Sequence, residues 1–265
     1  MTEIAMETLA CKIEDGLARV TLVQAERGNP INGTFCSELF HLAAQLSSRS
    51  DVRAVLLTGE GRFFSVGGDI SAFIKNREAL PRHIKLWTGQ FHSAIARLQR
   101  MDAPVVCAVQ GDVAGGAVSL AAMSDVLYAA KGVRFNAAFT MIGYCADSGT
   151  TVALSNRMGL TRAKRYLLLN EVLDADEALA AGLVDFVVTS DALLAEAEKT
   201  ATRLAAGPTL AYGEIRRTML SARTDPLETQ LENEAQALTR LAATDDAWEG
   251  LMAFSERRRP EFRGR

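Results

Sequence analysis

The sequence predicts an α/β fold in which helices pack a mainly parallel sheet and a helical tail follows. Short apolar runs, typical of buried strands, alternate with helix-periodic segments up to about residue 146. Two glycine-rich segments, at 59–69 and 111–116, each follow a strand and precede a helix. From about residue 147 the pattern is largely helical, with one β-like insert at 183–189. Apolar strands alternating with helices indicate parallel strands covered by helices.

The first 137 residues contain the strands from which the sheet is built. Asp15 and Gly16 form a hairpin dipeptide between two β-favouring runs, so residues 9–24 predict two paired strands. After a turn at 28–30, a helix is predicted by apolar residues at helical spacing: Phe35, Leu39, Leu42 and Leu46. The elements expected next are a strand at 51–58, a helix over about 80–100, a strand at 104–110, a helix after 116, and strands at 125–130 and 133–137.

Composition limits the class of protein. The chain has 265 residues, 48% hydrophobic and 23% charged, which is a globular balance rather than that of a disordered or fibrous chain. Its length indicates one large domain or one domain plus an appendage, and Pro208 marks either a joint or a helix start. Lys and Arg number 29 against 32 Asp and Glu, a formal net charge of −3. Nucleic-acid-binding proteins usually carry a basic excess, so composition disfavours that class of partner.

Cysteine and histidine spacing disfavours disulfide and metal sites. The four cysteines lie far apart and include no CxxC pair, and no histidines stand at metal-ligand spacing. The first residues lack the basic and apolar regions of a secretory signal, and no apolar run of about 18 residues predicts a membrane span. We therefore expect a cytoplasmic protein with no metal site and no membrane partner.

The two glycine-rich segments match none of the common nucleotide or nucleophile motifs. The chain contains no GxxxxGK[ST], no GxGxxG and no GxSxG at these positions. Glycine loops can still present backbone N–H groups at close range, and two facing loops would form a two-donor oxyanion hole. The alternative is that the glycines only make tight turns, and the pattern alone leaves both readings open.

Four stretches, in order, resemble the motifs of the enoyl-CoA hydratase/isomerase (crotonase) superfamily. GEGRFFSVGGDI at 59–70 is similar to the family run Phe-Ser/Cys-Ala-Gly-x-Asp-Leu/Ile after a strand. APVVCAVQGDVAGGAVSLAAMSDVLYAA at 103–130 resembles its second motif, a strand leading to a Gly-Gly loop. GLTRAKRYLLLNEVLDADEALAAGLVDFVV and the final EGLMAFSERRRPEFRGR resemble later family stretches. The resemblance covers about residues 9–263.

The resemblance implies the architecture and the class of substrate. It implies a spiral of ββα units in residues 1–200 that holds an acyl-CoA site, and a helical trimerisation region in residues 201–265. The implied assembly is a homotrimer or a hexamer made of two trimers. The implied substrate is an acyl-CoA thioester, so CoA is part of the substrate and no separate cofactor is needed.

The resemblance also implies a set of site residues. Family members stabilise a thioester enolate with two backbone amides, which correspond here to those of Val66 and Gly116. Such a donor is worth roughly 3–4 kcal/mol in comparable sites. Main-chain groups of residues 65–70 are expected to receive the adenine and pantetheine of CoA. The further substrate contacts are Ser65, Gly67, Gly68, Asp69, Ile70, Gly115, Ser119 and Phe139.

The chain departs from a hydratase at both water-activating positions. Family hydratases use two glutamates, and here Ser119 and Phe139 stand in their places. Phenylalanine cannot transfer a proton, and a serine hydroxyl is a poor general base. Ordinary enoyl-CoA hydration is therefore disfavoured.

One carboxylate, Asp147, remains close to these positions in the sequence. Its segment AFTMIGYCADSGTT resembles the 1,2-epoxyphenylacetyl-CoA isomerase branch of the family, which has Phe at this place and Asp in the following turn. Beside apolar residues such as Phe139 and Ile142, an aspartate can have a raised pKa that suits proton transfer between carbons. The alternative is that Asp147 only caps the next helix; Asp69 is expected to be such a cap.

The sequence therefore favours an acyl-CoA isomerase that moves a proton through a thioester enolate. A hydratase with an atypical water site and a non-catalytic acyl-CoA-binding homologue remain as alternatives. Four residues are expected to line the acyl pocket: Phe73, Trp87, Phe91 and Met141.

Overall fold

Two sheets organise the fold in a computed structural model that describes residues 1–75 and 77–265. The larger sheet has the strand order β1-β2-β3-β4-β6-β8-β11. Its first three strands pair antiparallel and the rest run parallel. Their bounds are β1 Thr2–Ala5, β2 Leu9–Glu14, β3 Leu17–Leu22, β4 Ala54–Gly59, β6 Val105–Val109, β8 Val126–Ala130 and β11 Phe186–Val188. The predicted mainly parallel sheet is confirmed.

The smaller sheet, of four strands, was not predicted as a separate sheet, although one of its members lies within the strand predicted at 133–137. Its order is β10-β9-β7-β5, formed by Val172–Asp174, Arg134–Asn136, Asp112–Ala114 and Phe63–Ser65. Strands β5 and β7 lie inside the two segments expected to be glycine loops. Each strand of this sheet has three residues, which is too short for an alternating pattern. Pairing with distant strands decides their structure.

The predicted hairpin at Asp15 and Gly16 is confirmed. Both residues have positive φ, 50° and 78°, and Glu14 pairs with Leu17 across the turn. Positive φ at both central residues is the requirement of a two-residue turn that matches the twist of the strands. The dipeptide Asp-Gly satisfies it at little cost.

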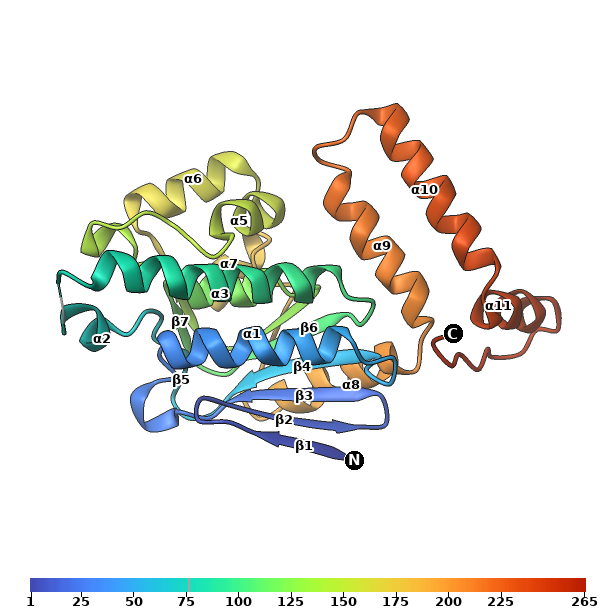
Figure 1. Cartoon of the computed structure of the whole chain (residues 1–265), viewed down its shortest axis with the longest axis horizontal. Helices are drawn as coiled ribbons and strands as arrows, with labels where there is room; N and C mark the ends of the chain where they lie inside the picture. Colours follow the sequence, from blue (N-terminus) through green and yellow to red (C-terminus); the bar gives the residue numbers. More distant parts are fainter. Residues whose placement is uncertain (76) are drawn as a thin grey trace.

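Helices cover the larger sheet and fill the space between the sheets. Helices α1 (Gly33–Ser47) and α3 (Leu80–Arg100) pack against each other, and α8 (Leu193–Ala205) packs against β4, β6 and β8 (Figure 1). Asn32 caps α1 by accepting a hydrogen bond from the Phe35 amide. The shorter helices are α2 Ile70–Ile74, α4 Gly116–Ala122, α5 Thr150–Met158, α6 Leu160–Leu169 and α7 Ala175–Ala180, with 3₁₀ turns at Ala25–Arg27 and Thr140–Ile142.

The C-terminal helices stand apart from the sheets. Helices α9 (Thr209–Ser221), α10 (Leu227–Ala242) and α11 (Asp245–Ser255) extend to one side of the molecule (Figure 1). Helix α8 runs through the predicted boundary between residues 200 and 201, so the separate helices begin only after Pro208. No helix in the described part of the chain is long and apolar enough to cross a membrane.

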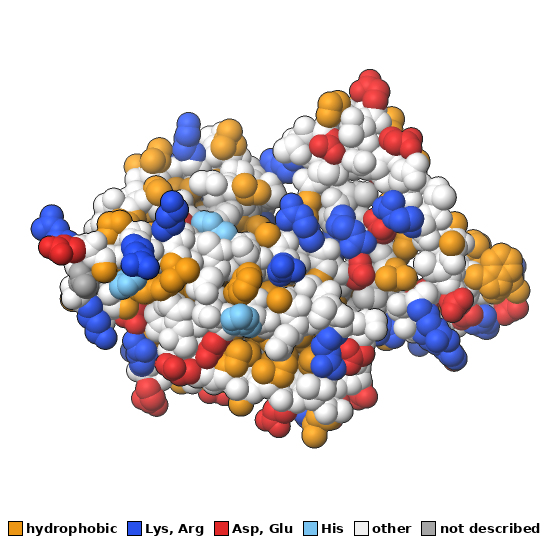
Figure 2. All heavy atoms as spheres, in the orientation of Figure 1, with side chains coloured by type: hydrophobic (Ala, Val, Ile, Leu, Met, Phe, Trp, Pro, Cys, Tyr) orange, Lys and Arg blue, Asp and Glu red, His pale blue; other side chains and the backbone are white. Residues whose placement is uncertain are grey.

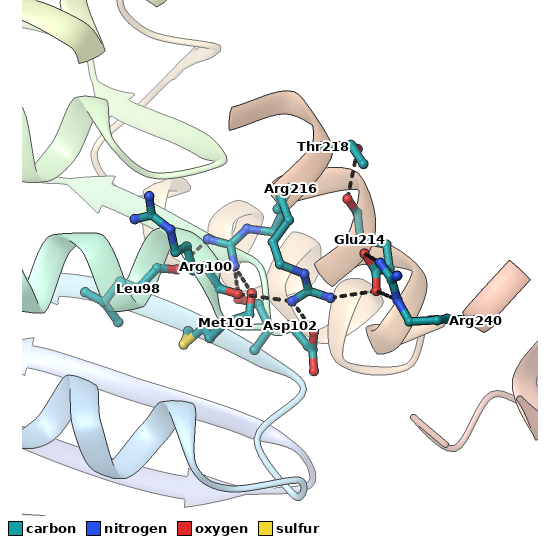
Figure 3. A network of polar contacts seen from close by, with 10 residues as sticks. Leu98, Arg100, Met101, Asp102, Glu214, Arg216, Thr218 and Arg240 are labelled. Atoms are coloured by element: carbon teal, nitrogen blue, oxygen red, sulfur yellow. Dashed lines mark hydrogen bonds and ion pairs between the residues drawn. The ribbon is translucent and has the colours of Figure 1, made fainter. Parts of the chain in front are cut away.

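Arg216 attaches α9 to the rest of the chain. Its side chain is 7% exposed, and its guanidinium pairs with Asp125 Oδ1 at 2.9 Å. It also donates to the carbonyl oxygens of Leu98, Met101 and Ala103, where α3 ends and β6 approaches (Figure 3). One side chain thus satisfies several buried acceptors at the base of the tail.

Replacing Arg216 by Met is expected to lower the free energy of unfolding by about 3–5 kcal/mol, because it removes the donor to three carbonyls and breaks the ion pair with Asp125, whose remaining hydrogen bond comes from Val105 N. The matched control is Arg217→Met. Arg217 is 37% exposed and pairs with Asp102 and Glu214, so its loss should cost about 1 kcal/mol or less. Urea unfolding of both variants measures the difference. Equal losses would contradict the anchoring role of Arg216.

Candidate active site

A cavity of about 560 Å³ opens where the two glycine segments meet α3 and the loop before α5. Most of its wall is apolar, and four expected pocket residues, Phe73, Trp87, Phe91 and Met141, all line it. The Phe73 ring stacks between Trp87 and Tyr144, with centroids 6.1 Å apart on each side. The sequence prediction of an apolar pocket at this place is confirmed.

In the first glycine segment, three of four consecutive amides already have partners. Val66 N donates to Gly28 O at 2.9 Å, Gly67 N to Ser65 Oγ at 3.1 Å, and Asp69 N to Ile31 O at 3.0 Å. Within residues 1–75 and 77–265, no group accepts a hydrogen bond from the amide of Gly68. Gly68 lines the cavity. The prediction that the Val66 amide is an oxyanion donor is therefore wrong. The available amide is that of Gly68, two residues later.

The second glycine segment supplies another available amide. Gly115 N donates to Asn136 O, whereas Gly116 begins α4 and its amide has no acceptor among the described residues. Helix starts leave such amides free because no preceding turn exists. Gly116 also lines the cavity. The expected donor at Gly116 is thus available to the cavity.

The two segments touch through their glycines. A Cβ at Gly67, whose φ is +82°, would lie 2.6 Å from Ala114 O. A Cβ at Gly115 would lie 3.9 Å from Gly68 N. Glycine is needed at Gly67 because the two backbones approach closely, and it is favoured at Gly115 because the φ there is +55°. This contact brings the free amides of Gly68 and Gly116 to one end of the cavity.

Several expected substrate contacts do not reach the cavity wall. Ser65 and Ser119 are fully buried and use their hydroxyls on backbone carbonyls, of Asn29 and Ser148 respectively. Gly67 is buried against the second segment. Asp69 caps α2 through the Ala72 amide, as expected, and pairs with Arg27 at 2.6 Å. These four residues support the backbone around the site and do not line the cavity.

The remaining expected contacts are on the wall. Together with the two free amides, the cavity is lined by Val66, Ile70, Gly115, Phe139 and Asp147. Phe139, which the sequence resemblance places where hydratases carry a glutamate, is 9% exposed. Among the described lining residues, Asp147 is the one charged side chain.

Asp147 is half-buried beside the apolar wall. Burial raises the pKa of its carboxyl above the ordinary 3.8, and hydrogen bonding from Ser148 opposes part of that rise. The residue at the N-cap of α5 is Gly149, which makes no side-chain cap. It is the backbone carbonyl of Asp147 that accepts from Thr150 N, at 2.8 Å. The alternative of a side-chain cap is therefore wrong, and the carboxyl remains available to the cavity.

Two residues that lie near Asp147 in the structure were not predicted from the sequence to belong to the site. His92 on α3 accepts a hydrogen bond from Ser148 N through Nε2 at 3.0 Å. Cys36 on α1 lines the cavity, and burial raises the pKa of its thiol to about 12, so it stays protonated. Neither stands near Asp147 in the sequence, and no spacing signals the contact.

The chain is similar to known proteins over nearly its whole length. A family model described as enoyl-CoA hydratase/isomerase matches residues 12–265. The 1,2-epoxyphenylacetyl-CoA isomerase of Escherichia coli (strain K12) is 32% identical over 98% of this chain and 100% of its own length. The trans-2-decenoyl-[acyl-carrier-protein] isomerase of Streptococcus mutans is 30% identical over 96% and 97%.

A solved enoyl-CoA hydratase from Polaromonas sp. JS666 superposes with a TM-score of 0.90 at 26% identity, covering 96% of this chain and 99% of that one. Relatives therefore bear both isomerase and hydratase names, and they share this fold over nearly the whole chain. The chain belongs to the enoyl-CoA hydratase/isomerase family.

Proposed function

We propose that the protein is an acyl-CoA isomerase whose proton carrier is Asp147. The observation that carries the proposal is an apolar cavity whose described wall has one carboxyl and two amides without an acceptor among the described residues. A thioester carbonyl oxygen placed at Gly68 N and Gly116 N accepts both hydrogen bonds. The acyl chain then extends along the wall toward Asp147.

The proposed reaction is a balanced proton transfer. The Asp147 carboxylate takes a proton from one carbon of the acyl chain, and the electron pair moves to the thioester oxygen as an enolate. The two amides stabilise that negative charge, by about 3 kcal/mol for each donor. The carboxylic acid then returns the proton to another carbon and the carbonyl reforms. CoA stays attached throughout, so the reaction needs no metal or redox cofactor.

Two side chains support isomerisation over hydration. The Ser119 hydroxyl donates to a backbone carbonyl, and Phe139 offers no polar atom. Asp147 is the one general base on the described wall, so a second carboxylate to orient water is missing there. Incubation with a β,γ-enoyl-CoA should yield the α,β-isomer at unchanged mass. A product heavier by one water would favour the hydratase alternative, and unchanged substrate the non-catalytic one.

The pH dependence should follow Asp147. The first step needs the carboxylate, so kcat/KM is lost as pH falls through its pKa. Because burial raises that pKa, the acid limb should lie above the pH expected for an ordinary aspartate. Rates measured across the acid range would show this. A limb at or below the ordinary pKa of 3.8 would contradict a buried proton carrier.

The wall also limits the acyl group. Asp147 is the one charged residue on the described wall, and most other lining side chains are apolar. A carboxylate at the far end of the acyl chain would therefore be buried without a partner and repelled by Asp147. We expect kcat/KM for an apolar enoyl-CoA to exceed that for an ω-carboxylated enoyl-CoA of equal length by about a hundredfold or more. Equal rates would contradict the proposed orientation of the acyl chain.

We further propose that α9–α11 form the contact of a homotrimer or of a hexamer. Large apolar side chains are exposed on these helices, and Figure 2 shows hydrophobic side chains over α11 at the tip of the tail. They include Met219, Leu227, Leu238, Trp248, Leu251 and Phe254. Exposed apolar area of this kind marks association surfaces, and a mass measured in solution tests the assembly.

A further inference from the structure

The backbone around Ser148 is held from three directions. Its amide donates to Nε2 of His92 on α3 at 3.0 Å. Its carbonyl accepts from the hydroxyl of Ser119 on α4. The preceding carbonyl, that of Asp147, accepts from both the amide and the hydroxyl of Thr150. The peptide that joins Asp147 to Ser148 is therefore bonded at both its N–H and its C=O.

Ser148 has a backbone conformation that needs such support. Its φ is +56° although it is not glycine, and the side chain is 1% exposed. A left-handed conformation costs a residue with a Cβ roughly 1–2 kcal/mol, and such residues persist where their surroundings hold them. The clamp, by which we mean the hydrogen bond that Ser148 N donates to His92 and the one that Ser148 O accepts from Ser119, fixes the direction in which the adjacent Asp147 side chain leaves the backbone.

We propose that His92 and Ser119 are positioning residues that hold the Asp147 carboxyl at the cavity wall. The proposal rests on the function proposed above, since it assumes that Asp147 transfers the proton. Neither residue lines the cavity, so both act through the Ser148 backbone. Ser119, at the place where a hydratase has its first glutamate, thus has a structural role in the neighbouring loop.

The test uses two replacements of His92. His92→Leu removes the acceptor, whereas His92→Gln places a carbonyl oxygen near the position of Nε2, where it can accept from Ser148 N. His92→Leu should lower kcat about 10- to 100-fold with KM changed less than about twofold, because small displacements of a reacting group have effects of that size. His92→Gln should recover kcat to within about fivefold of the unmodified protein. His41→Leu, an exposed histidine on α1, is the matched control.

Two outcomes would overturn the proposal. If His92→Gln is as slow as His92→Leu, the imidazole itself takes part in chemistry. If His92→Leu keeps full kcat, the Ser148 hydrogen bond does not position Asp147. Both variants should fold, because His92 is exposed on α3.

Ser119 supplies an independent check through coupling. Ser119→Ala leaves the Ser148 carbonyl without its donor, and the double variant with His92→Leu should lose less kcat than the product of the two single losses. Multiplicative losses would contradict a shared point of action. Urea unfolding identifies a Ser119→Ala protein that is merely destabilised.

Amide exchange separates failure of the clamp from failure of the proposed function. The Ser148 amide should exchange faster in His92→Leu than in the unmodified protein and return toward the slow rate in His92→Gln. This readout needs no substrate. Faster exchange in His92→Leu without any isomerase activity in the unmodified protein would reject the function while retaining the clamp. Unchanged exchange would reject the clamp.

Discussion

Replacing Asp147 by Asn should lower kcat for isomerisation about 10²–10⁴-fold. Asparagine keeps the shape of the side chain but can neither accept nor return a proton at the acyl carbon. KM should change little, because the thioester oxygen still contacts Gly68 N and Gly116 N. Single-turnover rates on a β,γ-enoyl-CoA measure the effect on the chemical step alone.

The same variant should be more stable than the unmodified protein at neutral pH. Burial raises the pKa of Asp147 in the folded state, so above that pKa its ionisation opposes folding. Stability contributed by the protonated form is present at low pH and lost as pH rises through the folded-state pKa. Lower activity together with a higher free energy of unfolding distinguishes a lost proton carrier from a damaged fold. Activity within tenfold of the unmodified protein would contradict the role of Asp147.

Replacing Gly116 by Pro should lower kcat about 10²–10³-fold, the usual effect of losing one oxyanion donor. Proline removes the amide hydrogen that we place against the thioester oxygen. Gly116 is the first residue of α4, where proline is well tolerated because the N–H has no helical partner. Circular dichroism and urea unfolding check that the fold persists.

Gly116→Ala is the matched control because it keeps the N–H. A Cβ at Gly116 would lie 3.4 Å from Ser148 Oγ and 3.5 Å from a ring carbon of Phe91, so alanine fits with small adjustments. We expect its kcat to fall less than about tenfold. If alanine is as slow as proline, steric filling of the cavity explains the loss and the amide does not.

Long elements and side-chain patterns were predictable from the sequence. The hairpin strands, helices α1 and α3, and strands β4, β6 and β8 each extend over five residues or more, which is enough to show an apolar run or a period. Strand β11 has three residues and lies within the β-like insert predicted at 183–189. Strands β5, β7, β9 and β10 have three residues each, and their pairing comes from partners far along the chain. The helix cap at Asp69 could be predicted from the sequence because it depends on residues within one helical turn.

The position of the free amide in the first glycine segment could not be predicted from the sequence. Every residue there has an amide, and the difference between Val66 and Gly68 is that Gly28 O already accepts from the former. That acceptor lies 38 residues earlier, so the identity of the side chains near Val66 does not predict the hydrogen bond. The contacts of Ser148 with Ser119 and His92 span 29 and 56 residues and were invisible for the same reason.

Deuterium incorporation from deuterated water tests the central claim most directly. The unmodified protein and Asp147→Asn would each be incubated with apolar β,γ- and α,β-enoyl-CoAs, and the products analysed by mass spectrometry. We predict that the unmodified protein moves the double bond and places deuterium on the acyl chain without adding water, and that Asp147→Asn does neither. Net addition of water, or deuterium incorporation by Asp147→Asn at the unmodified rate, would contradict an enolate mechanism with Asp147 as the proton carrier.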